Sequence, residues 1–330
     1  MPVRVDVLDP PAFTPPYDHA LCAALAGAGA RVRLLTGPFR HGAWPAAPGF
    51  ERVVRSRARH LLRPWPGDAD VRHVQWAPLP ELDQLRRPPR PWVLTAHDAV
   101  PRAPRRFQRA AHERLLHAAD AVVVHAEHSA ARLRALGVRA HVIPHGVLDL
   151  GPPGALPREL RDDGAPVVLL FGLLRPYKGL DVLLEAWEGV TGAQLWVVGA
   201  PRMPLPARLP PGVQLVPRFV SDAEGSAVLR RADVVVLPYR DIEQSGVLFA
   251  ALGLGKPLVL SAVGGFPEVA PAAVLVPPGD AAALRAELDR LLGDEAARAA
   301  LAAAAARAAR ERFGWEAIAR RHLELYAKIA

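Results

Sequence analysis

The sequence contains a single cysteine, Cys22, so no intramolecular disulfide can form. This scarcity is typical of proteins that fold in a reducing compartment such as the cytoplasm. No apolar run approaches the roughly 20 residues that a membrane-spanning helix requires. Residues 1–8 have the pattern of a strand rather than that of a signal peptide. We therefore expect a cytoplasmic, unexported protein.

Signatures of nucleic-acid binding are also absent. Aromatic residues make up 6% of the chain, and there is no RNA-binding aromatic motif, zinc-ligand spacing or basic heptad. The formal net charge of +8 nevertheless favours anionic partners such as nucleotides or phospholipid surfaces. We expect no nucleic-acid partner, and two alternatives stay open for the basic first half: peripheral association with an acidic membrane surface, or an excess of solvated arginine. Its arginines include Arg31, Arg33, Arg52, Arg55, Arg57, Arg59, Arg63, Arg86, Arg87, Arg90, Arg102, Arg105, Arg106 and Arg109.

The order of strand and helix patterns predicts an α/β fold. A length of 330 residues exceeds what one hydrophobic core usually organises, so two domains are expected. Alternating strands and helices are typical of doubly wound parallel sheets. The predicted strands are residues 3–8, 32–36, 71–75, 92–95, 121–125 and 141–143, then 167–171, 194–198, 213–216, 234–237, 257–260 and 273–276. The predicted helices are residues 19–28, 109–118, 129–136, 180–187, 223–229, 246–252 and 315–329.

A segment rich in proline and glycine, residues 151–157, separates the two halves and is the predicted linker. We expect one domain at residues 1–150, a second at 151–312, and a final helix within 313–330 that packs back on the first domain. Residues 281–312 have the pattern of two helices with a break near Gly293. Residues 38–66 show no clear period, so an irregular insertion is predicted there.

The most informative motif is Phe-Gly-Leu-Leu-Arg-Pro-Tyr-Lys-Gly at residues 171–179. It follows an unbroken apolar run and precedes a helical pattern, so it forms a strand-to-helix turn. A helix N-terminus presents free N–H groups and a positive dipole end to an anion. Arg175 and Lys178 add formal charge at the same turn. Residues 171–179 therefore predict a binding site for a diphosphate.

Eight segments in order resemble the retaining glycosyltransferases of family 4 (group 1). This resemblance covers nearly the whole chain and implies the GT-B fold, in which two Rossmann-like domains face each other across a cleft. It also implies transfer of a sugar from a nucleoside diphosphate to an acceptor hydroxyl with retention of configuration. The segments are residues 71–76, 93–98, 119–125, 142–147, 171–179, 232–239, 244–248 and 255–259, the last followed by 263–268.

The resemblance implies roles for residues in both domains. The donor diphosphate would be held by Arg175 and Lys178, and by Ser245, Gly246 and Val247 at the N-terminus of the predicted helix 246–252. His97 would face the reacting sugar, and Asp98 would cap or orient. Tyr17 and Asp18 would approach the donor or acceptor, Phe219 and Val220 would lie beside the nucleobase, and Glu268 would meet the sugar or close a turn. No metal or other cofactor is expected, because the Asp68-Ala-Asp70 sequence precedes its strand and has the pattern of a turn.

The chain also departs from the family pattern. Ala250 stands where the family has the glutamate that meets the nucleotide ribose, and an alanine cannot accept that hydrogen bond. Asp241 and Glu243 lie near the position of the family's other glutamate, and either could serve. Two rival functions therefore stay open: a sugar-nucleotide epimerase or phosphorylase of the same fold, and a non-catalytic partner that binds a nucleotide sugar or glycan. The sequence does not identify the base, the sugar or the acceptor.

Overall fold

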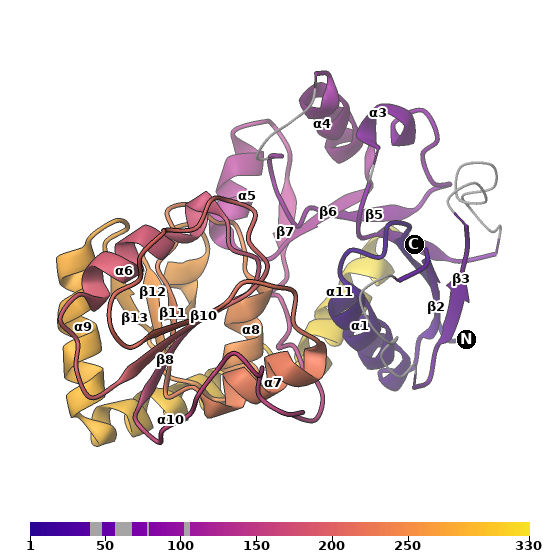
Figure 1. The fold of residues 1–330 in the computed structure, drawn as a ribbon. Helices are drawn as coiled ribbons and strands as arrows, with labels where there is room; N and C mark the ends of the chain where they lie inside the picture. Colours follow the sequence, from indigo (N-terminus) through magenta and orange to yellow (C-terminus); the bar gives the residue numbers. More distant parts are fainter. Residues whose placement is uncertain (40–47, 57–67, 78, 102–105) are drawn as a thin grey trace. The chain divides into compact units, whose positions relative to one another are not determined.

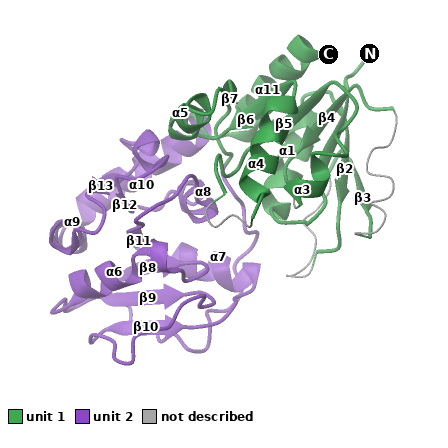
Figure 2. Cartoon of the chain, turned by 90° about the horizontal axis from the view of Figure 1, so that it is seen from above, with its two compact units in different colours: residues 1–146, 312–330 green, residues 147–311 purple. Residues whose placement is uncertain are grey.

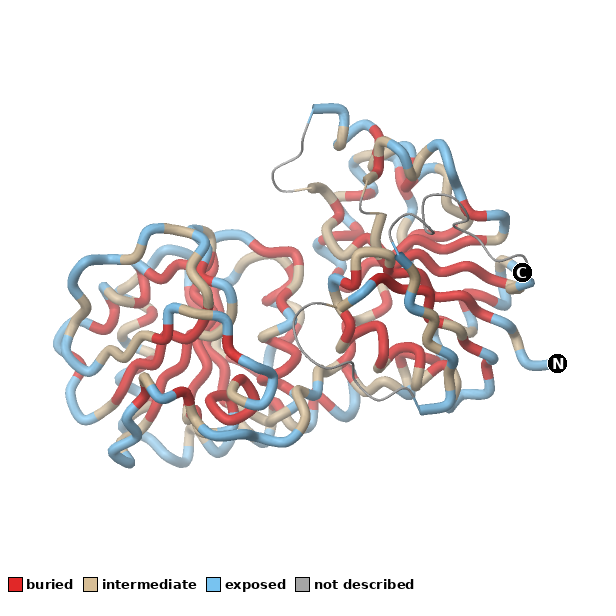
Figure 3. Tube along the Cα trace, turned by 45° about the vertical axis from the view of Figure 1, so that its right-hand side comes forward, coloured by how far each residue is buried: buried red, intermediate tan, exposed pale blue. Residues whose placement is uncertain are grey.

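The computed structural model describes residues 1–39, 48–56, 68–77, 79–101 and 106–330. These residues form two compact units (Figure 2). Unit 1 comprises residues 1–146 and 312–330, and unit 2 comprises residues 147–311. In each unit the buried backbone follows the central strands, whereas the connecting loops are largely exposed (Figure 3).

In its described residues, unit 1 contains a seven-stranded sheet with the order β3-β2-β1-β4-β5-β6-β7 (Figure 1). All neighbouring strands are parallel, so their carboxyl ends lie at one edge. Strands β4, β5 and β6 are buried along their whole length, as expected where both faces of a parallel sheet are covered. The strands are β1 Arg4–Asp9, β2 Arg31–Thr36, β3 Glu51–Val54, β4 Val71–Val74, β5 Trp92–Thr95, β6 Ala121–Val124 and β7 Ala140–Val142.

The C-terminal helix belongs to unit 1, where it packs against the first helix. Tyr326 of this helix is fully buried, and its hydroxyl forms a 2.6 Å hydrogen bond with Nδ1 of His73 on β4. The chain's last residues are thus anchored to the central strands of a sheet formed by its first half. The helices of unit 1 are α1 Pro15–Gly27, α3 Pro80–Asp83, α4 Gln108–Ala118, α5 Glu127–Arg134 and α11 Trp315–Ile329.

Unit 2 contains a six-stranded parallel sheet with the order β10-β9-β8-β11-β12-β13. Its strands are β8 Val167–Phe171, β9 Gln194–Val198, β10 Val213–Val216, β11 Val234–Leu237, β12 Leu258–Ser261 and β13 Val274–Val276. Its helices are α6 Leu180–Trp187, α7 Asp222–Arg231, α8 Gly246–Gly253, α9 Ala281–Gly293 and α10 Glu295–Glu311, with 3-10 turns η1 Pro176–Lys178 and η2 Phe266–Val269. The predicted α/β fold with two doubly wound parallel sheets is therefore confirmed.

Two local predictions need correction. Residues 51–54 form the edge strand β3, although an irregular insertion was predicted over 38–66; only half-buried, this strand shows no hydrophobic period. Residues 40–47 and 57–67 of that insertion lie outside the described residues. The predicted linker at 151–157 is part of unit 2, because Gly154 N donates to Ala223 O (2.9 Å) and Ser226 Oγ donates to Gly151 O (2.8 Å).

Among the residues that the structure describes, none of the helices combines the length and the apolar character needed to cross a bilayer.

Candidate functional site

Each sheet contains a point where the strand order reverses, between β1 and β4 in unit 1 and between β8 and β11 in unit 2. Ligands of open parallel sheets bind outside the carboxyl ends of the strands at such a point. The predicted residues His97, Arg175, Lys178 and Ser245 all follow strand ends at or next to these points.

Lys178 lies at the centre of the candidate anion site in unit 2. Its side chain is buried, and its Nζ donates to Phe171 O at 3.4 Å. A Cβ atom on Gly172, whose φ is +95°, would lie 3.0 Å from Lys178 Nζ and 3.2 Å from Val247 Cγ2. The ammonium group therefore lies next to the first turn of α8. The turn after β8 and the start of α8, which follows the loop after β11, therefore meet at Lys178.

The N-terminus of α8 is open to a ligand. Ser245 occupies the N-cap position, but its side chain makes no capping hydrogen bond. Gly246, the first helical residue, is exposed. The first N–H groups of a helix have no intrahelical acceptor, so they can donate to an anion. The ammonium group of Lys178 and the first N–H groups of α8 are therefore hydrogen-bond donors that could bind the same anion.

The two arginines near this site have different surroundings. Arg240 forms a bidentate ion pair with Asp181 of α6, with distances of 2.6 and 2.7 Å. Arg175 is exposed, and in the described part of the chain its guanidinium takes part in no ion pair. Arg175 therefore retains its hydrogen-bonding capacity for a ligand, whereas that of Arg240 is largely used within the protein.

The predicted donor contacts after β11 and β12 lie in adjacent loops. Gly264, with a φ of +54°, packs against the carbonyl oxygen of Ile242, so close that a side chain at this position would overlap it. This contact brings the loop of Glu243, which is buried, next to the turn that carries the half-buried Glu268. Ala250 lies inside α8 with 4% exposure. It offers no polar atom to a ligand.

The loop after β10 is held by a cluster of charges. Arg218 pairs with Glu159 and Glu224 at 2.7 Å each, and its Nη1 donates to the carbonyl oxygen of Phe219 at 3.2 Å. The Phe219 ring is 54% exposed, and Val220 is buried. Phe219, predicted to lie beside the nucleobase, thus lies on a loop held by ion pairs. This loop follows the edge strand β10 and not one of the two strands at which the strand order reverses.

In unit 1, His97 is held by residues from the two strands beside its own. Its Nε2 lies 3.1 Å from Oε1 of Gln75, the residue that follows β4. Its Nδ1 lies 3.2 Å from Nε2 of His125, the residue that follows β6. The Trp76 ring stacks on the imidazole, with ring centres 4.7 Å apart and an interplanar angle of 11°. Loss of hydration, together with the neighbouring histidines, lowers the pKa of His97 well below its usual value, so the ring is neutral.

Tyr17 and Asp18, predicted on the acceptor side, lie inside unit 1. Tyr17 is buried, with its ring against those of His97, His125 and His145. Asp18 is also buried beside Asp9, and burial raises the pKa of both carboxyl groups. Asp18 Oδ2 accepts a hydrogen bond from Thr14 Oγ1 (3.3 Å). Asp18 thus binds Thr14, the residue before α1, whereas Tyr17 packs against the three histidine rings.

A hollow of about 270 Å³ opens beside His97. Asp98 lines it, together with Gln75, Trp76 and the exposed ring of Phe13, which meets Trp76 edge-on at 5.4 Å. His97 and Asp98 were predicted as site residues, whereas Gln75, Trp76 and His125 were not. The signal for two of these was present, since Gln75 and His125 each end a predicted strand.

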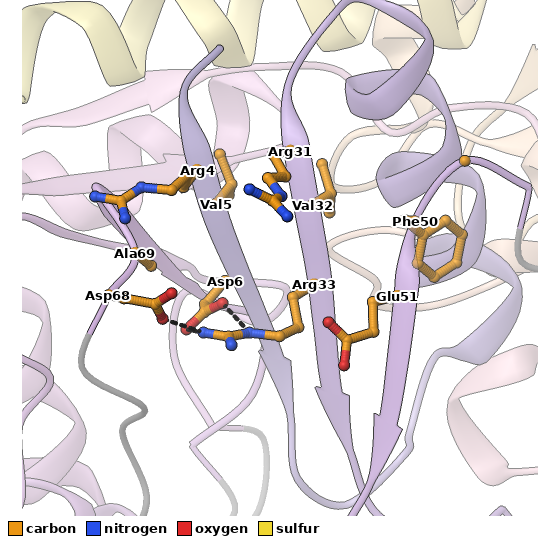
Figure 4. Close-up of a pocket in the computed structure, with 11 residues that line it drawn as sticks. Arg4, Val5, Asp6, Arg31, Val32, Arg33, Phe50, Glu51, Asp68 and Ala69 are labelled. Carbon is orange, nitrogen blue, oxygen red and sulfur yellow. Dashed lines mark hydrogen bonds and ion pairs between the residues drawn. The ribbon is translucent and has the colours of Figure 1, made fainter. Parts of the chain in front are cut away.

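A larger hollow of about 600 Å³ lies along β1, β2 and β3, outside the candidate site (Figure 4). Its charged groups largely pair with one another: Arg33 binds Asp6 at 2.8 Å and Asp68 at 2.9 Å. Asp70 binds Arg4 at 2.7 Å. The two carboxylates of the Asp68-Ala-Asp70 sequence are thus engaged by arginines. In the described residues, no group of three or more His, Cys, Asp or Glu side chains is arranged to hold a metal ion.

Two α/β units, each built on a parallel sheet, are the architecture of the GT-B glycosyltransferases. Residues 2–148 match the family model Glycosyltransferase Family 4, and residues 165–294 match the model Glycosyl transferases group 1. The chain belongs to this glycosyltransferase family.

Individual relatives agree with this assignment. The chain is 32% identical over 303 residues to a phosphatidyl-myo-inositol mannosyltransferase of Mycobacterium leprae, covering 85% of this chain and 79% of the relative. It is 35% identical over 246 residues to a D-inositol 3-phosphate glycosyltransferase of Xylanimonas cellulosilytica, covering 66% and 58%, respectively. Among solved structures, Anabaena HepE in complex with UDP and glucose matches with a TM-score of 0.75 at 18% identity, covering 99% of this chain and 100% of that one.

Proposed function

We propose that this protein transfers a sugar from a nucleoside diphosphate to an acceptor hydroxyl, with retention of configuration and without a resident metal ion. The observation that carries this proposal is the position of Lys178 Nζ beside Val247 at the N-terminus of α8, with the exposed Arg175 on the same turn as Lys178. The Anabaena structure that shares the fold contains UDP and glucose. A nucleoside-diphosphate sugar is therefore the donor class that we assign to unit 2.

The chemistry follows from where negative charge develops. When the bond between sugar and diphosphate breaks, the leaving nucleotide gains negative charge. Fixed cations and helix N–H groups stabilise that charge more strongly in the transition state than in the ground state. Lys178, Arg175 and the N–H groups of α8 would supply this stabilisation, a role that metal ions fill in other transferases. In a same-face displacement, a departing phosphate oxygen accepts the proton of the acceptor hydroxyl, so no protein nucleophile is needed.

The acceptor would bind to unit 1. The hollow beside His97 combines aromatic rings with polar groups, as sites for polar ring-shaped ligands commonly do. The relative from Mycobacterium leprae is named a phosphatidyl-myo-inositol mannosyltransferase, which supports an inositol-containing acceptor. On this unit the exposed side chains of Leu82 and Leu85 lie at and beside α3, which packs against α4, and the exposed Phe107 precedes α4. With the nearby exposed Arg87, they support peripheral binding to an anionic membrane surface.

Two experiments test these assignments. Incubation with UDP- and GDP-sugars and a panel of hydroxyl acceptors, in excess chelator, is followed by NMR of the product. A glycoside with the donor's anomeric configuration supports the proposal. An inverted product contradicts retention, and dependence on added metal contradicts the metal-free site. An epimerised nucleotide sugar identifies the rival enzyme, whereas tight donor binding without any product identifies a non-catalytic partner.

Co-sedimentation with vesicles tests the membrane proposal separately. The protein is expected to bind vesicles that contain anionic phospholipid and not to bind zwitterionic ones. Binding to the anionic vesicles is expected to weaken in the double variant Leu85→Ser, Phe107→Ser. Equal sedimentation with both vesicle types would contradict it.

A further inference from the structure

A hydrogen-bonded chain links the ends of three neighbouring strands of unit 1 through the buried Gln75 and His125 and the half-buried His97. It starts at the carbonyl oxygen of Ile143, which accepts from Nδ1 of His125 at 3.0 Å. It continues from Nε2 of His125 to Nδ1 of His97 at 3.2 Å, and ends between Nε2 of His97 and the Gln75 amide at 3.1 Å. The strands that these residues follow, β4, β5 and β6, are consecutive in the sheet.

The backbone carbonyl determines where the protons of this chain lie. A carbonyl oxygen only accepts, so the proton of His125 is on Nδ1. Burial lowers the pKa of His125 to about 4, so its ring is neutral near pH 7 and its Nε2 is an acceptor. His97 must then donate to it from Nδ1, since two unprotonated nitrogens at 3.2 Å would repel each other. The neutral His97 ring therefore has its lone pair on Nε2.

The Gln75 side chain completes the chain in either of two orientations. With Oε1 toward His97, the amide accepts a hydrogen bond from Nε2 of a protonated ring, and in the described residues its own buried Nε2 has no partner. A half turn of the amide brings its NH₂ group to the same position, where it donates to the lone pair of the neutral ring. Gln75 is fully buried and lines the hollow beside His97.

We propose that His125 and Gln75 are positioning residues for His97: His125 fixes the proton on Nδ1, and the Gln75 amide orients Nε2 in either protonation state. Nε2 has one in-plane bonding position, so a hydroxyl in the hollow meets His97 there by displacing the Gln75 amide: Nε2 accepts from the hydroxyl when the ring is neutral and donates to it after the ring has taken a proton. The role in transfer rests on the proposed function, whereas the position of the proton does not.

NMR of ¹⁵N-histidine-labelled full-length protein at neutral pH tests the proton position directly. The His97 signals are assigned by their loss in His97→Gln. We expect a protonated Nδ1 and a pyridine-type Nε2. In His125→Leu, which removes the acceptor, the proton is expected to move to Nε2, where Gln75 Oε1 can accept it. His141→Leu, which removes an exposed histidine of β7 in the same unit, serves as the matched control and leaves the His97 signals unchanged. A wild-type ring with its proton on Nε2 overturns the proposal, as does an unchanged tautomer in His125→Leu.

Gln75 is tested by a pair of variants. Gln75→Glu places a group that only accepts beside Nε2, so His97 is expected to hold both protons to a pH at least one unit higher than in the wild type. Gln75→Leu offers neither donor nor acceptor and is expected to lower kcat about tenfold while leaving the donor KM unchanged. Unchanged NMR signals of His73, which is fully buried in the core of the same unit, show that each variant is folded. If the wild type transfers no sugar, the proposed function fails, and the NMR results still decide the proton position.

Discussion

The ammonium group of Lys178, after the end of β8, lies 5.2 Å from the centre of the Tyr239 ring, after the end of β11. This cation–π contact helps to hold the ammonium group in place. Tyr239→Leu is therefore expected to weaken nucleoside-diphosphate binding about three- to tenfold, the usual range for such a contact. Tyr239→Phe retains the ring and should bind like the wild type in a calorimetric titration. Equal losses in both variants would contradict a role for the ring.

Gly172 provides a test of the space around Lys178. Gly172→Ala adds a Cβ next to Lys178 Nζ and Val247, at a φ of +95°. Gly189→Ala is the matched control, because Gly189 has a φ of +75° and nothing within 4 Å of the added atom. Both changes are expected to cost about 1–2 kcal/mol of stability from backbone strain. Only Gly172→Ala should also reduce diphosphate affinity, by about tenfold; equal affinities in the two variants would contradict the site.

Removal of either of two tyrosine hydroxyls in the core of unit 1 is predicted to change the stability of the protein differently. Tyr326→Phe leaves Nδ1 of the fully buried His73 without its 2.6 Å partner, which should cost about 1–3 kcal/mol in urea unfolding. Within the described residues the buried Tyr17 hydroxyl has no hydrogen-bond partner. Tyr17→Phe is therefore expected to be neutral or stabilising. A larger loss in Tyr17→Phe than in Tyr326→Phe would contradict this account of the core.

The Asp9 and Asp18 pair gives unit 1 a predicted pH dependence. Burial raises the pKa of both carboxyl groups, so the folded state holds protons that the unfolded chain has already released. Stability should therefore fall as the pH rises from the unfolded-state pKa through the raised value. Asp18→Asn removes one of these ionisations and is expected to raise the melting temperature at pH 7, with a smaller gain at pH 4. An equal change at both pH values would exclude this origin.

The sequence predicted much of the candidate site because its signals are local. The turn with Arg175 and Lys178 and the helix start at Ser245 each lie within one strand-to-helix connection, where hydrophobic period and glycine position are visible. The partners of His97 depend on which strands are neighbours. Gln75 and His125 are far from His97 in sequence and meet it only because β4, β5 and β6 are adjacent.

Burial was harder to predict than position. Tyr17 and Asp18 begin the first helix, which suggested access to a ligand, yet their side chains point into unit 1. Burial beside Asp9 also raises the pKa of Asp18, because two buried carboxyl groups are not readily both ionised. This effect depends on the fold and has no signature in the sequence. The edge strand β3 was missed for the opposite reason, because a half-exposed strand has no apolar run.

The central claim is that Lys178 and Arg175 hold the diphosphate of a sugar donor, and titration calorimetry with UDP and GDP in excess chelator tests it most directly. The double variant Arg175→Ala, Lys178→Met should bind the preferred nucleotide at least a hundredfold more weakly than the wild type, because it loses two charge-assisted contacts. Arg240→Ala, which removes an arginine already paired with Asp181, is the control and should retain most of the affinity. Wild-type affinity in the double variant would contradict the account.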